Sequence, residues 1–320
     1  TTEIYTLSLH DALPICRCGG CQIGHISTDN QTFIKRQMID RLLCSETSSK
    51  TLFPAYDYFE GPWTHYRYRT QFSRNAEHKP CFMARASNTR IPVEYCPICA
   101  PAINTWLQNA AGQLAENPQI PERFTLTANS ARVFVEGVDK HAEASILGKK
   151  ISYATDGFFQ SNLELLPELI LEAMEKAEGS KALDLYSGAG LFGAFLAERF
   201  DKVECVEQNP GNSAWIQGNV PGASVFALAA EDWIQLPASG SRFDYIMLDP
   251  PRNGLSKPLR RWLAAKKAPS IGYVSCNPET LVRDIRELCA GGYTVDKLQF
   301  FDFYPHTMEL EAYARLVYAP

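Results

Sequence analysis

The sequence predicts an α/β protein in which a mainly parallel sheet, covered by helices on both faces, follows a smaller α+β region. After residue 156, apolar strand-like segments alternate with helix-like segments, and this alternation is typical of parallel sheets. Before residue 156 the segments do not alternate in this way. The chain has 320 residues, 45% of them hydrophobic, which is enough for about two domains. We therefore predict domains at 16–155 and 156–320.

The first fifteen residues do not fit the pattern that follows. They resemble a translated sequencing adapter more than native protein, so we leave 1–15 out of the fold prediction and expect the native N-terminus to be missing. The helical spacing of Ile34, Met38 and Leu42 predicts a helix over 31–43. Short strands rich in Tyr, Phe, Arg and Thr are expected within 63–95, a helix at 98–115 and a strand at 132–137.

The second region opens with a helix that Asn162 can cap and that runs towards Gly179. Strands are then expected at 182–186, 203–207, 224–228, 243–249 and 271–275. Helices are expected at 191–199, 209–219, 256–266 and 279–289, and two closing strands near 293–300 and 312–318. No apolar run reaches the ~20 residues of a membrane span and no stretch reads as a signal peptide, so we expect a cytoplasmic protein.

Charge is divided unevenly along the chain, whose formal net charge is -5. Residues 16–150 hold 16 Lys+Arg against 12 Asp+Glu, whereas residues 151–320 hold 15 against 22. The basic half is where contacts with nucleic-acid phosphates are expected. So small an excess is also typical of an ordinary solvated surface.

A glycine-rich run, DLYSGAGLFG from Asp184 to Gly193, joins the first strand of the second region to a helix. Its glycines permit a tight turn and let a ligand approach the backbone. The run also contains the G-x-G-x-x-G pattern of dinucleotide-binding loops. Asp184 would repel an anionic pyrophosphate, which favours the cationic methyl donor S-adenosylmethionine over a nicotinamide cofactor. Glu207, at the end of the next strand, suits a pair of ribose hydroxyls, which both cofactors share.

Two polar turns follow later strands. Asp249 begins the run DPPR and Cys276 lies in the run YVSCNP, both at carboxyl ends of strands, where open α/β sheets bind ligands. Each has a structural alternative, since Asp249 could cap a helix and Cys276 could be a small buried apolar residue. The run from Phe301 to Glu311 adds carboxylates between the two closing strands.

A thiol, a carboxylate and a methyl donor together suit methyl transfer to an unactivated pyrimidine carbon. Carbon 5 of uracil is a poor nucleophile until a thiolate adds to carbon 6 and creates an enolate. The enolate takes the methyl group, a base removes the carbon-5 proton, and the thiol is eliminated. Because an unperturbed thiol is ionised only to a few per cent at neutral pH, the site must activate Cys276 or deprotonate it on attack.

Five ordered motifs together resemble the RNA 5-methyluridine methyltransferases, which modify 23S ribosomal RNA and the T-loop of tRNA. The motifs are FFQSN (Phe158 to Asn162), DLYSGAGLFG, DPPRNGL, YVSCNP with Thr280 and Asp284, and FDFYPHTMELE. The resemblance covers nearly everything after residue 15. It implies a class I (Rossmann-like) S-adenosylmethionine-dependent methyltransferase domain with a smaller RNA-binding domain. The implied reaction methylates carbon 5 of a specific uridine in 23S rRNA, with tRNA as the alternative substrate.

The resemblance also implies roles for single residues. Cys276 resembles the nucleophile and Glu311 the base, with Glu309 as the rival base by composition. His306 is expected to be a structural hydrogen-bonding residue, and Leu191 stands where some family members have asparagine. The expected cofactor-site residues are Gln160, Tyr186, Gly188, Glu207 and Asp249.

Five of the ten cysteines fall in two tight groups in the first half of the chain, which suggests metal or cluster ligation in a reducing compartment. Cys18, Cys21 and Cys96 resemble ligands of the [4Fe–4S] cluster found in the ribosomal-RNA branch of the family, which needs four thiolates. The family's first ligand falls on Ala12. Cys16 or Cys99 would replace it, or the cluster is incomplete; a zinc site or buried free thiols are the alternatives.

Two further features bear on RNA binding. The run from His65 to Arg74 interleaves aromatic and basic residues, and on a strand Arg67 and Arg69 would share one face that could hold phosphates. A plain core strand is the alternative. A target base must leave its stack to reach a thiol, and Phe158 or Phe159 is the expected aromatic beside it.

Other function classes stay open on the sequence alone. One is a nicotinamide-dependent oxidoreductase that uses the glycine-rich run. Another is an RNA-binding metal module without catalysis. RNA is the expected partner, and neither a protein partner nor a membrane is expected.

Overall fold

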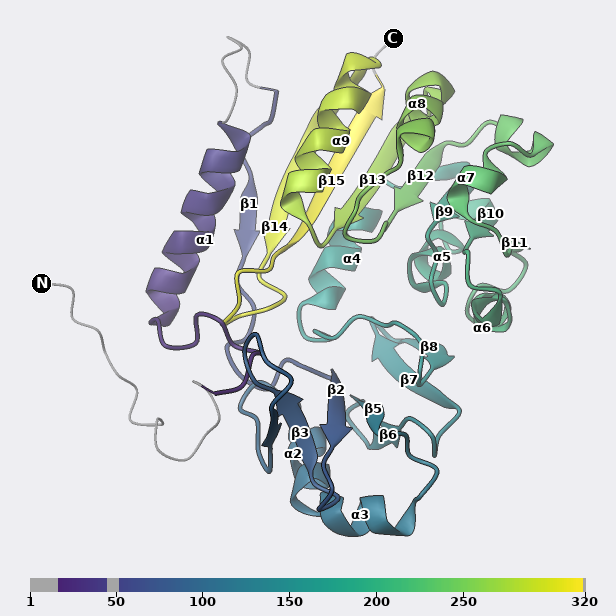
Figure 1. The fold of residues 1–320 in the computed structure, drawn as a ribbon. Helices are drawn as coiled ribbons and strands as arrows, with labels where there is room; N and C mark the ends of the chain where they lie inside the picture. Colours follow the sequence, from purple (N-terminus) through teal and green to yellow (C-terminus); the bar gives the residue numbers. More distant parts are fainter. Residues whose placement is uncertain (1–16, 45–51, 319–320) are drawn as a thin grey trace, which may run out of the picture. The chain divides into compact units, whose positions relative to one another are not determined.

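The computed structural model describes residues 17–44 and 52–318 (Figure 1). It divides into two compact units that are interleaved along the chain. The first unit comprises Thr1–Arg36, Gly61–Leu166 and Phe303–Met308, and the second comprises Gln37–Glu60, Pro167–Asp302 and Glu309–Pro320. The segment 1–15 that the sequence sets apart lies outside the described residues. No helix within the described ranges is long and apolar enough to cross a membrane.

The second unit is built around an eight-stranded sheet with the order β1-β14-β15-β13-β12-β9-β10-β11. Every neighbouring pair is parallel except the two that β15 forms with β13 and β14. The strands are β1 (Asp57–Phe59), β9 (Gly179–Leu185), β10 (Phe200–Val206), β11 (Ser224–Phe226), β12 (Tyr245–Leu248), β13 (Ser270–Ser275), β14 (Tyr293–Phe301) and β15 (Glu311–Tyr318).

The direction of β15 follows from the length of the connection before it. Parallel neighbours need a crossover of about a dozen residues or more, usually with a helix. Only the segment 302–310 joins β14 to β15, and it contains no helix. The chain therefore turns back on itself, and β15 enters between β14 and β13 as the one reversed strand of the sheet.

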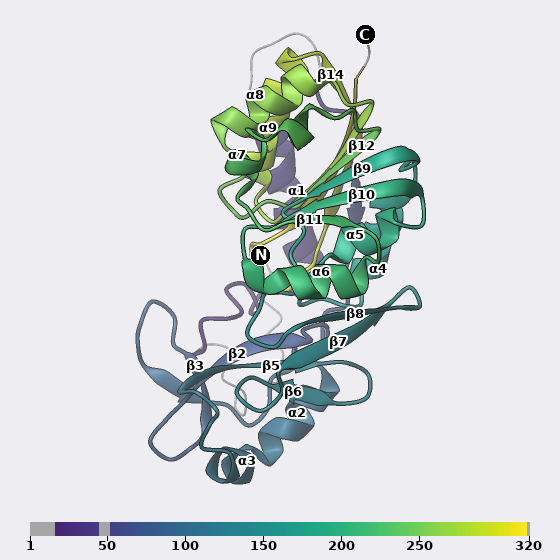
Figure 2. The same cartoon turned by 90° about the vertical axis from the view of Figure 1, so that its right-hand side faces the viewer.

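Helices cover both faces of this sheet, as the sequence predicts. In Figure 2, α7, α8 and α9 lie on one face, and α4 and α5 lie on the other. Buried side chains from several of these elements, including Trp233, Leu263 and Leu288, join Leu248 of β12 in one apolar cluster. The helices are α1 (Thr28–Leu43), α4 (Leu166–Met174), α5 (Leu191–Leu196), α6 (Ser213–Asn219), α7 (Ala230–Trp233), α8 (Lys257–Lys266) and α9 (Pro278–Ala290). Short 3-10 turns, η2 (Pro210–Asn212) and η3 (Pro237–Gly240), precede α6 and β12.

The first unit is α+β. Its antiparallel sheet has the order β4-β3-β2-β5-β6, and a separate hairpin is formed by β7 and β8. Phe72, Phe124, Leu107 and Leu114 lie in its buried core. The elements are β2 (Arg69–Arg74), β3 (Pro80–Met83), β4 (Arg90–Pro92), α2 (Pro101–Gln108), α3 (Ala110–Glu116), β5 (Arg123–Ala128), β6 (Val133–Val135), β7 (His141–Ile146) and β8 (Lys149–Ala154).

The single helix predicted at 98–115 is wrong in one respect. The structure has two short helices there, because Asn109 leaves helical geometry with φ -112 and ψ 12. Its side chain donates a hydrogen bond to the Thr105 carbonyl, and its backbone N–H bonds to Trp106. Asparagine bonds readily to nearby backbone, so it favours such a break.

Candidate active site

The polar loops of the second unit meet where the strand order of its sheet reverses. The order runs outward from β9 towards β11 on one side and from β12 towards β1 on the other. Open α/β sheets bind ligands outside the carboxyl ends of strands at such a switch point. The segment 186–190 follows β9 and the segment 249–256 follows β12, so both begin at this point.

The loop after β9 has an unusual backbone. Tyr186, Gly188 and Gly190 adopt positive φ angles of 64°, 55° and 87°. The left-handed region is open to glycine, but a tyrosine there stores strain of order 1 kcal/mol or more, and such residues cluster at functional sites. A Cβ atom added to Gly188 would meet nothing within 4 Å. The backbone of Gly188 is therefore open to a ligand, as the sequence prediction requires.

Glu207 follows β10 and reaches this loop. Its Oε2 accepts a hydrogen bond from the Gly188 N–H at 2.9 Å, and its Oε1 accepts one from the Asn209 N–H at 2.8 Å. A carboxylate has about four lone-pair sites, so these two bonds leave acceptors for further hydroxyl donors. Glu207 thus fixes the loop and can still bind a diol.

Asp184 lies elsewhere than the sequence argument places it. Its position before the loop predicts a carboxylate beside the ligand, but the side chain is fully buried and Oδ2 accepts a hydrogen bond from the Gly193 N–H at 2.9 Å. Its Oδ1 has no partner among the described residues. Burial, with smaller contributions from Asp249 and Glu207, raises the pKa of Asp184 to about 8. Asp184 therefore holds the start of α5 as a largely neutral acid, and it gives no ground for preferring a cationic ligand.

Cys276 and Glu311 face each other across two neighbouring strands. In the antiparallel ladder of β13 and β15, Ser275 pairs with Ala312. Extending this register by one residue places Cys276 opposite Glu311, and directly opposite residues have Cβ atoms about 4.5–5.5 Å apart. Cys276 is half-buried and Glu311 is buried. Residues far apart in sequence are brought together because β15 inserts beside β13.

The charges at this point make both groups hard to ionise. Burial, then the carboxylates of Glu311 and Asp249, raise the pKa of Cys276 to about 11, while Arg252 opposes the shift. Burial and the neighbouring Asp249 raise the pKa of Glu311 well above its usual range. Two carboxyl groups that share a poorly solvated site cannot both ionise readily, so they retain a proton between them.

Glu309, the rival base, lies in a different environment. Its carboxylate forms an ion pair with Arg252, and 38% of its side chain is exposed. The Glu309 carboxylate is thus bound to a surface guanidinium, whereas Glu311 is buried and acts on Cys276 electrostatically. The described contacts therefore favour Glu311 over Glu309 for proton removal.

His306 belongs to the first unit and is bound at both ring nitrogens. Nε2 bonds to the Trp63 carbonyl at 2.8 Å and Nδ1 to the Gln31 amide at 3.2 Å. The Gln31 Oε1 also accepts a hydrogen bond from the His306 N–H at 2.9 Å. These contacts fit the structural role that the sequence prediction gives His306.

The motif FFQSN also lies in the first unit. Gln160 is buried, and its Oε1 has no hydrogen-bond partner among the described residues. Phe159 stacks on Tyr153 with ring centroids 3.8 Å apart and is buried. Phe158 is 70% exposed. Of the two aromatic candidates, only Phe158 has a ring face free for a nucleobase.

The cysteines of the first unit are bonded locally. Cys18 Sγ accepts a hydrogen bond from the Gly20 N–H at 3.3 Å, Cys99 bonds to Thr70 at 3.5 Å, and the Cys96 sulfur accepts from the Cys99 thiol. Within 17–44 and 52–318, no group of three or more His, Cys, Asp or Glu side chains is arranged to hold a metal ion. The charge of Cys96 contributes to the raised pKa of both Cys18 and Cys21, so the three expected ligands lie within electrostatic reach of one another. The described residues do not by themselves show a [4Fe–4S] site, and Cys16 lies outside them.

Arg67 and Arg69 do not form the exposed basic face expected of a regular strand. β2 begins only at Arg69, and the Arg69 Nη2 donates to the Gly157 carbonyl at 2.6 Å. Tyr66, on the other side, is buried and donates to the Pro305 carbonyl at 2.8 Å. The side chains of Arg69 and Tyr66 therefore both bind backbone carbonyls of the protein itself.

The sheet order, the reversed strand β15 and the loops at the switch point together define a class I S-adenosylmethionine-dependent methyltransferase fold. A family model described as tRNA (uracil-5-)-methyltransferase matches residues 234–317. An uncharacterized RNA methyltransferase of Treponema denticola is 30% identical over 97% of this chain and 84% of its own length. A 23S rRNA uracil-C5 methyltransferase, RlmD, of Haemophilus influenzae is 29% identical over 92% of this chain and 79% of its own.

A solved structure supports the fold assignment. The crystal structure of Pyrococcus abyssi tRNA (uracil-54, C5)-methyltransferase in complex with S-adenosyl-L-homocysteine superposes with a TM-score of 0.78. It covers 93% of this chain and 86% of its own at 22% identity. The chain belongs to the RNA uracil-C5 methyltransferase family, whose members are S-adenosylmethionine-dependent enzymes.

Two features of the site escaped sequence reasoning. The left-handed backbone at Tyr186 has no signal in the sequence, because the residue type argues against it. Arg252 lowers the pKa of Cys276, against the effect of the neighbouring carboxylates. It lies in the motif DPPRNGL, but the sequence alone assigned it no role.

Proposed function

We propose that this enzyme methylates carbon 5 of a uridine in 23S ribosomal RNA through a covalent bond between Cys276 and carbon 6 of the base. One observation carries the proposal. Cys276, Glu311 and Asp249, which come from three separate motifs, act on one another electrostatically where β12 and β13 end and β15 begins. A half-buried thiol beside two carboxyl groups supplies the nucleophile and the base that the reaction requires.

In the first step, the sulfur of Cys276 bonds to carbon 6 and the uracil ring becomes an enolate. With a pKa of about 11, the thiol is almost wholly protonated at neutral pH. Its proton must therefore leave as the sulfur–carbon bond forms, and the ionised member of the Asp249–Glu311 pair is the neighbouring acceptor. Arg252 favours the transient thiolate. S-adenosylmethionine, when bound, supplies the methyl group that carbon 5 accepts.

In the second step, Glu311 removes the proton from carbon 5. The electron pair of that bond forms the carbon 5–carbon 6 double bond, and the bond between carbon 6 and sulfur breaks to release Cys276. Glu311 must be ionised at this point, so the carboxyl pair first releases to solvent the proton that it took from Cys276. After Glu311 takes the carbon-5 proton, the pair returns one proton to the departing sulfur, which restores the Cys276 thiol and the single proton that the pair holds at rest. A high pKa makes Glu311 a strong base once it is ionised.

The residues around the loop after β9 are proposed to bind the methyl donor. The open backbone at Gly188 admits the ligand, Glu207 accepts hydrogen bonds from its ribose hydroxyls, and the ring of Tyr186 lies next to the same loop. Gln160 is a further candidate, because its buried Oε1 has an unused acceptor site. A buried polar atom without a partner is costly unless a ligand completes it.

RNA recognition is proposed to involve base extrusion. A uracil inside a helical stack cannot present carbon 6 to a thiol, so it must rotate out. The exposed ring of Phe158 is the proposed stacking partner, since base–aromatic stacking contributes about 1–3 kcal/mol. The similarity to the Haemophilus influenzae enzyme runs along 92% of the chain and supports 23S rRNA as the substrate.

The test is methyl transfer from labelled S-adenosylmethionine to unmodified 23S rRNA and unmodified tRNA, followed by mapping of 5-methyluridine by mass spectrometry. We expect label at one uridine of 23S rRNA with the wild-type chain and none with Cys276→Ala. Label only in tRNA would replace the proposed substrate but keep the chemistry. Transfer by Cys276→Ala at the wild-type rate would overturn the covalent mechanism.

A further inference from the structure

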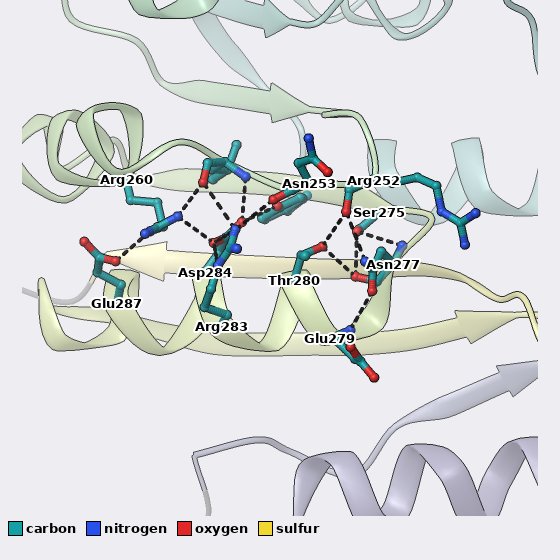
Figure 3. A network of polar contacts seen from close by, with 12 residues as sticks. Arg252, Asn253, Arg260, Ser275, Asn277, Glu279, Thr280, Arg283, Asp284 and Glu287 are labelled. Atoms are coloured by element: carbon teal, nitrogen blue, oxygen red, sulfur yellow. Dashed lines mark hydrogen bonds and ion pairs between the residues drawn. The ribbon is translucent and has the colours of Figure 1, made fainter.

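Asp284 of α9 is a charged residue in the interior of the second unit. Its side chain has no exposed surface, and it receives four hydrogen bonds. Oδ2 accepts from the Leu255 N–H at 2.7 Å and from the Tyr273 hydroxyl at 2.8 Å. Oδ1 accepts from Arg260 at 3.1 Å and from Arg283 at 2.8 Å (Figure 3). Two guanidinium groups thus compensate one buried carboxylate, and all its lone-pair directions are used.

These partners come from elements that flank the candidate active site. Leu255 ends the DPPRNGL loop that begins at Asp249, and Tyr273 lies in β13, three residues before Cys276. Arg260 lies in α8 and also pairs with Glu287 at 2.6 Å. Asp284 therefore joins the loop after β12 to the strand that carries Cys276.

Side chains at the start of α9 bind the same loop through its carbonyl groups. Arg283 donates to the Asn253 carbonyl at 3.0 Å, and Thr280 and Asn277 donate to the Arg252 carbonyl at 3.3 Å and 3.0 Å. Figure 3 shows these donors along one side of α9, facing the loop. Asn277 also caps α9 by accepting from the Glu279 N–H at 3.1 Å. The loop is thus bound at successive backbone groups to the helix that begins directly after Cys276.

The loop also packs too closely to α9 to tolerate displacement. Gly254 has a φ of 69°, and a Cβ atom there would lie 2.6 Å from the Asp284 Oδ2 and 2.9 Å from the Thr280 Cβ. Only a residue without a side chain allows this approach. Asp249 and Arg252 lie on this loop, and both act on Cys276.

We propose that Asp284 and Arg283 are positioning residues that hold Asp249 and Arg252 against Cys276 by fixing the backbone of the loop 249–255. They act through the backbone of this loop, to which both residues are hydrogen-bonded. The inference rests on the proposed function, because it concerns the geometry that the covalent step requires. Misplacement of about 1 Å can cost a reaction two orders of magnitude.

Three variants separate this role from simple stability. Asp284→Asn keeps the size of the side chain but turns one acceptor into a donor that faces donors. Arg283→Gln removes bonds to the loop at a residue whose side chain is 48% exposed, so it leaves a folded protein even if the buried change does not. Glu287→Gln is the matched control, since among the described residues the Glu287 carboxylate bonds only to the Nε of Arg260, whose Nη1 keeps its own bonds to Asp284 and to the Leu255 carbonyl of the loop.

The first measurement is the rate at which iodoacetamide labels Cys276 in the free protein as a function of pH, followed by peptide mass spectrometry. A loosened loop admits water to Cys276, and since burial is the main cause of its high pKa, labelling at a fixed pH should rise. We expect about a tenfold increase, equal to a fall of one pH unit in the midpoint, for Asp284→Asn and Arg283→Gln. Glu287→Gln should label at the wild-type rate.

The second measurement is methyl transfer. We expect kcat of the two positioning variants to fall at least about tenfold while KM for S-adenosylmethionine stays within about twofold. Wild-type labelling of Cys276 in both positioning variants would overturn the proposal, whatever the chain's methyl transfer. Faster labelling with unchanged kcat would also overturn it. Failure of the wild-type chain to transfer methyl groups would count against the proposed function instead, and the labelling result would still decide the positioning claim.

Discussion

Replacing Glu311 by glutamine separates the two halves of the proposed reaction. At rest the carboxyl group is largely neutral, since burial and Asp249 raise its pKa well above the usual range. Glutamine has nearly the same shape and the same charge as the protonated acid. We therefore expect Glu311→Gln to fold with an unchanged melting temperature and to bind RNA and the methyl donor normally.

In the variant, Cys276 should still add to carbon 6 of the uracil, and carbon 5 should still accept the methyl group. Without the Glu311 carboxylate, however, the carbon-5 proton cannot be removed. General bases contribute about 10²–10⁴-fold to such steps. Glu311 is only 2% exposed, so solvent water cannot easily take over its role, and we expect a loss near 10⁴. That factor corresponds to about 5.5 kcal/mol in the barrier.

The assay follows two signals at once, methylated product and the fraction of protein that migrates with RNA after denaturation. With ordinary uridine, wild type should show product and little covalent complex, whereas Glu311→Gln should show the reverse. Wild-type kcat should also rise about tenfold per pH unit below the raised pKa of Glu311, because only the ionised form is a base. A variant with wild-type turnover, or one without any covalent complex, would refute the assignment of Glu311.

Three further predictions concern the loop, the donor site and the cysteines. The pKa of Asp184 is about 8 in the folded state and 3.8 in the unfolded chain. The protonated side chain therefore stabilises the fold at low pH, and this stabilisation is lost between the two values at up to about 1.4 kcal/mol per pH unit. Asp184→Asn should therefore gain stability relative to wild type from about pH 5 to about pH 8, and a constant difference in urea unfolding would contradict this. Glu207→Gln should weaken binding of S-adenosylhomocysteine about tenfold in calorimetry, as expected for losing charge-assisted hydrogen bonds, whereas unchanged affinity would move the ribose site elsewhere. Cys18, Cys21 and Cys96 act on one another electrostatically, so iron and zinc analysis of the purified chain should find a metal that Cys18→Ser loses, and a chain free of both metals would contradict cluster or zinc ligation by these cysteines.

Most of the fold could be predicted because local and long-range signals agree. β12, with the sequence YIML, is buried on both faces, and its uninterrupted apolar run is typical of a central parallel strand. Helix α9 begins at Pro278 after the capping residue Asn277, as a helix-start pattern predicts. The reversed direction of β15 could not be predicted from its own residues. The direction of β15 depends on the short connection 302–310 that precedes it and on its position between β14 and β13 in the sheet.

The candidate site was predictable in its parts rather than in its contacts. The motifs name Cys276 and Glu311, but only the register of β13 and β15 shows that they face each other. For Asp184 the prediction from the sequence was wrong. A strand residue next to a ligand loop can point either towards the ligand or into the core, and the flanking residues do not show which of the two directions it takes. Asp284 appeared only as part of a motif, since its four partners come from segments that the sequence alone does not bring together.

The proposed mechanism depends above all on Cys276 as the nucleophile, and RNA that carries 5-fluorouridine at the target position tests this most directly. Fluorine cannot leave carbon 5 as a proton, so the enzyme should stop as a covalent complex that survives denaturation. We predict this complex for wild type and for Cys289→Ala, a half-buried cysteine of the same unit, with the modified peptide containing residue 276. Cys276→Ala should form none. A complex formed by Cys276→Ala, or none formed by wild type on RNA that it methylates, would contradict the mechanism.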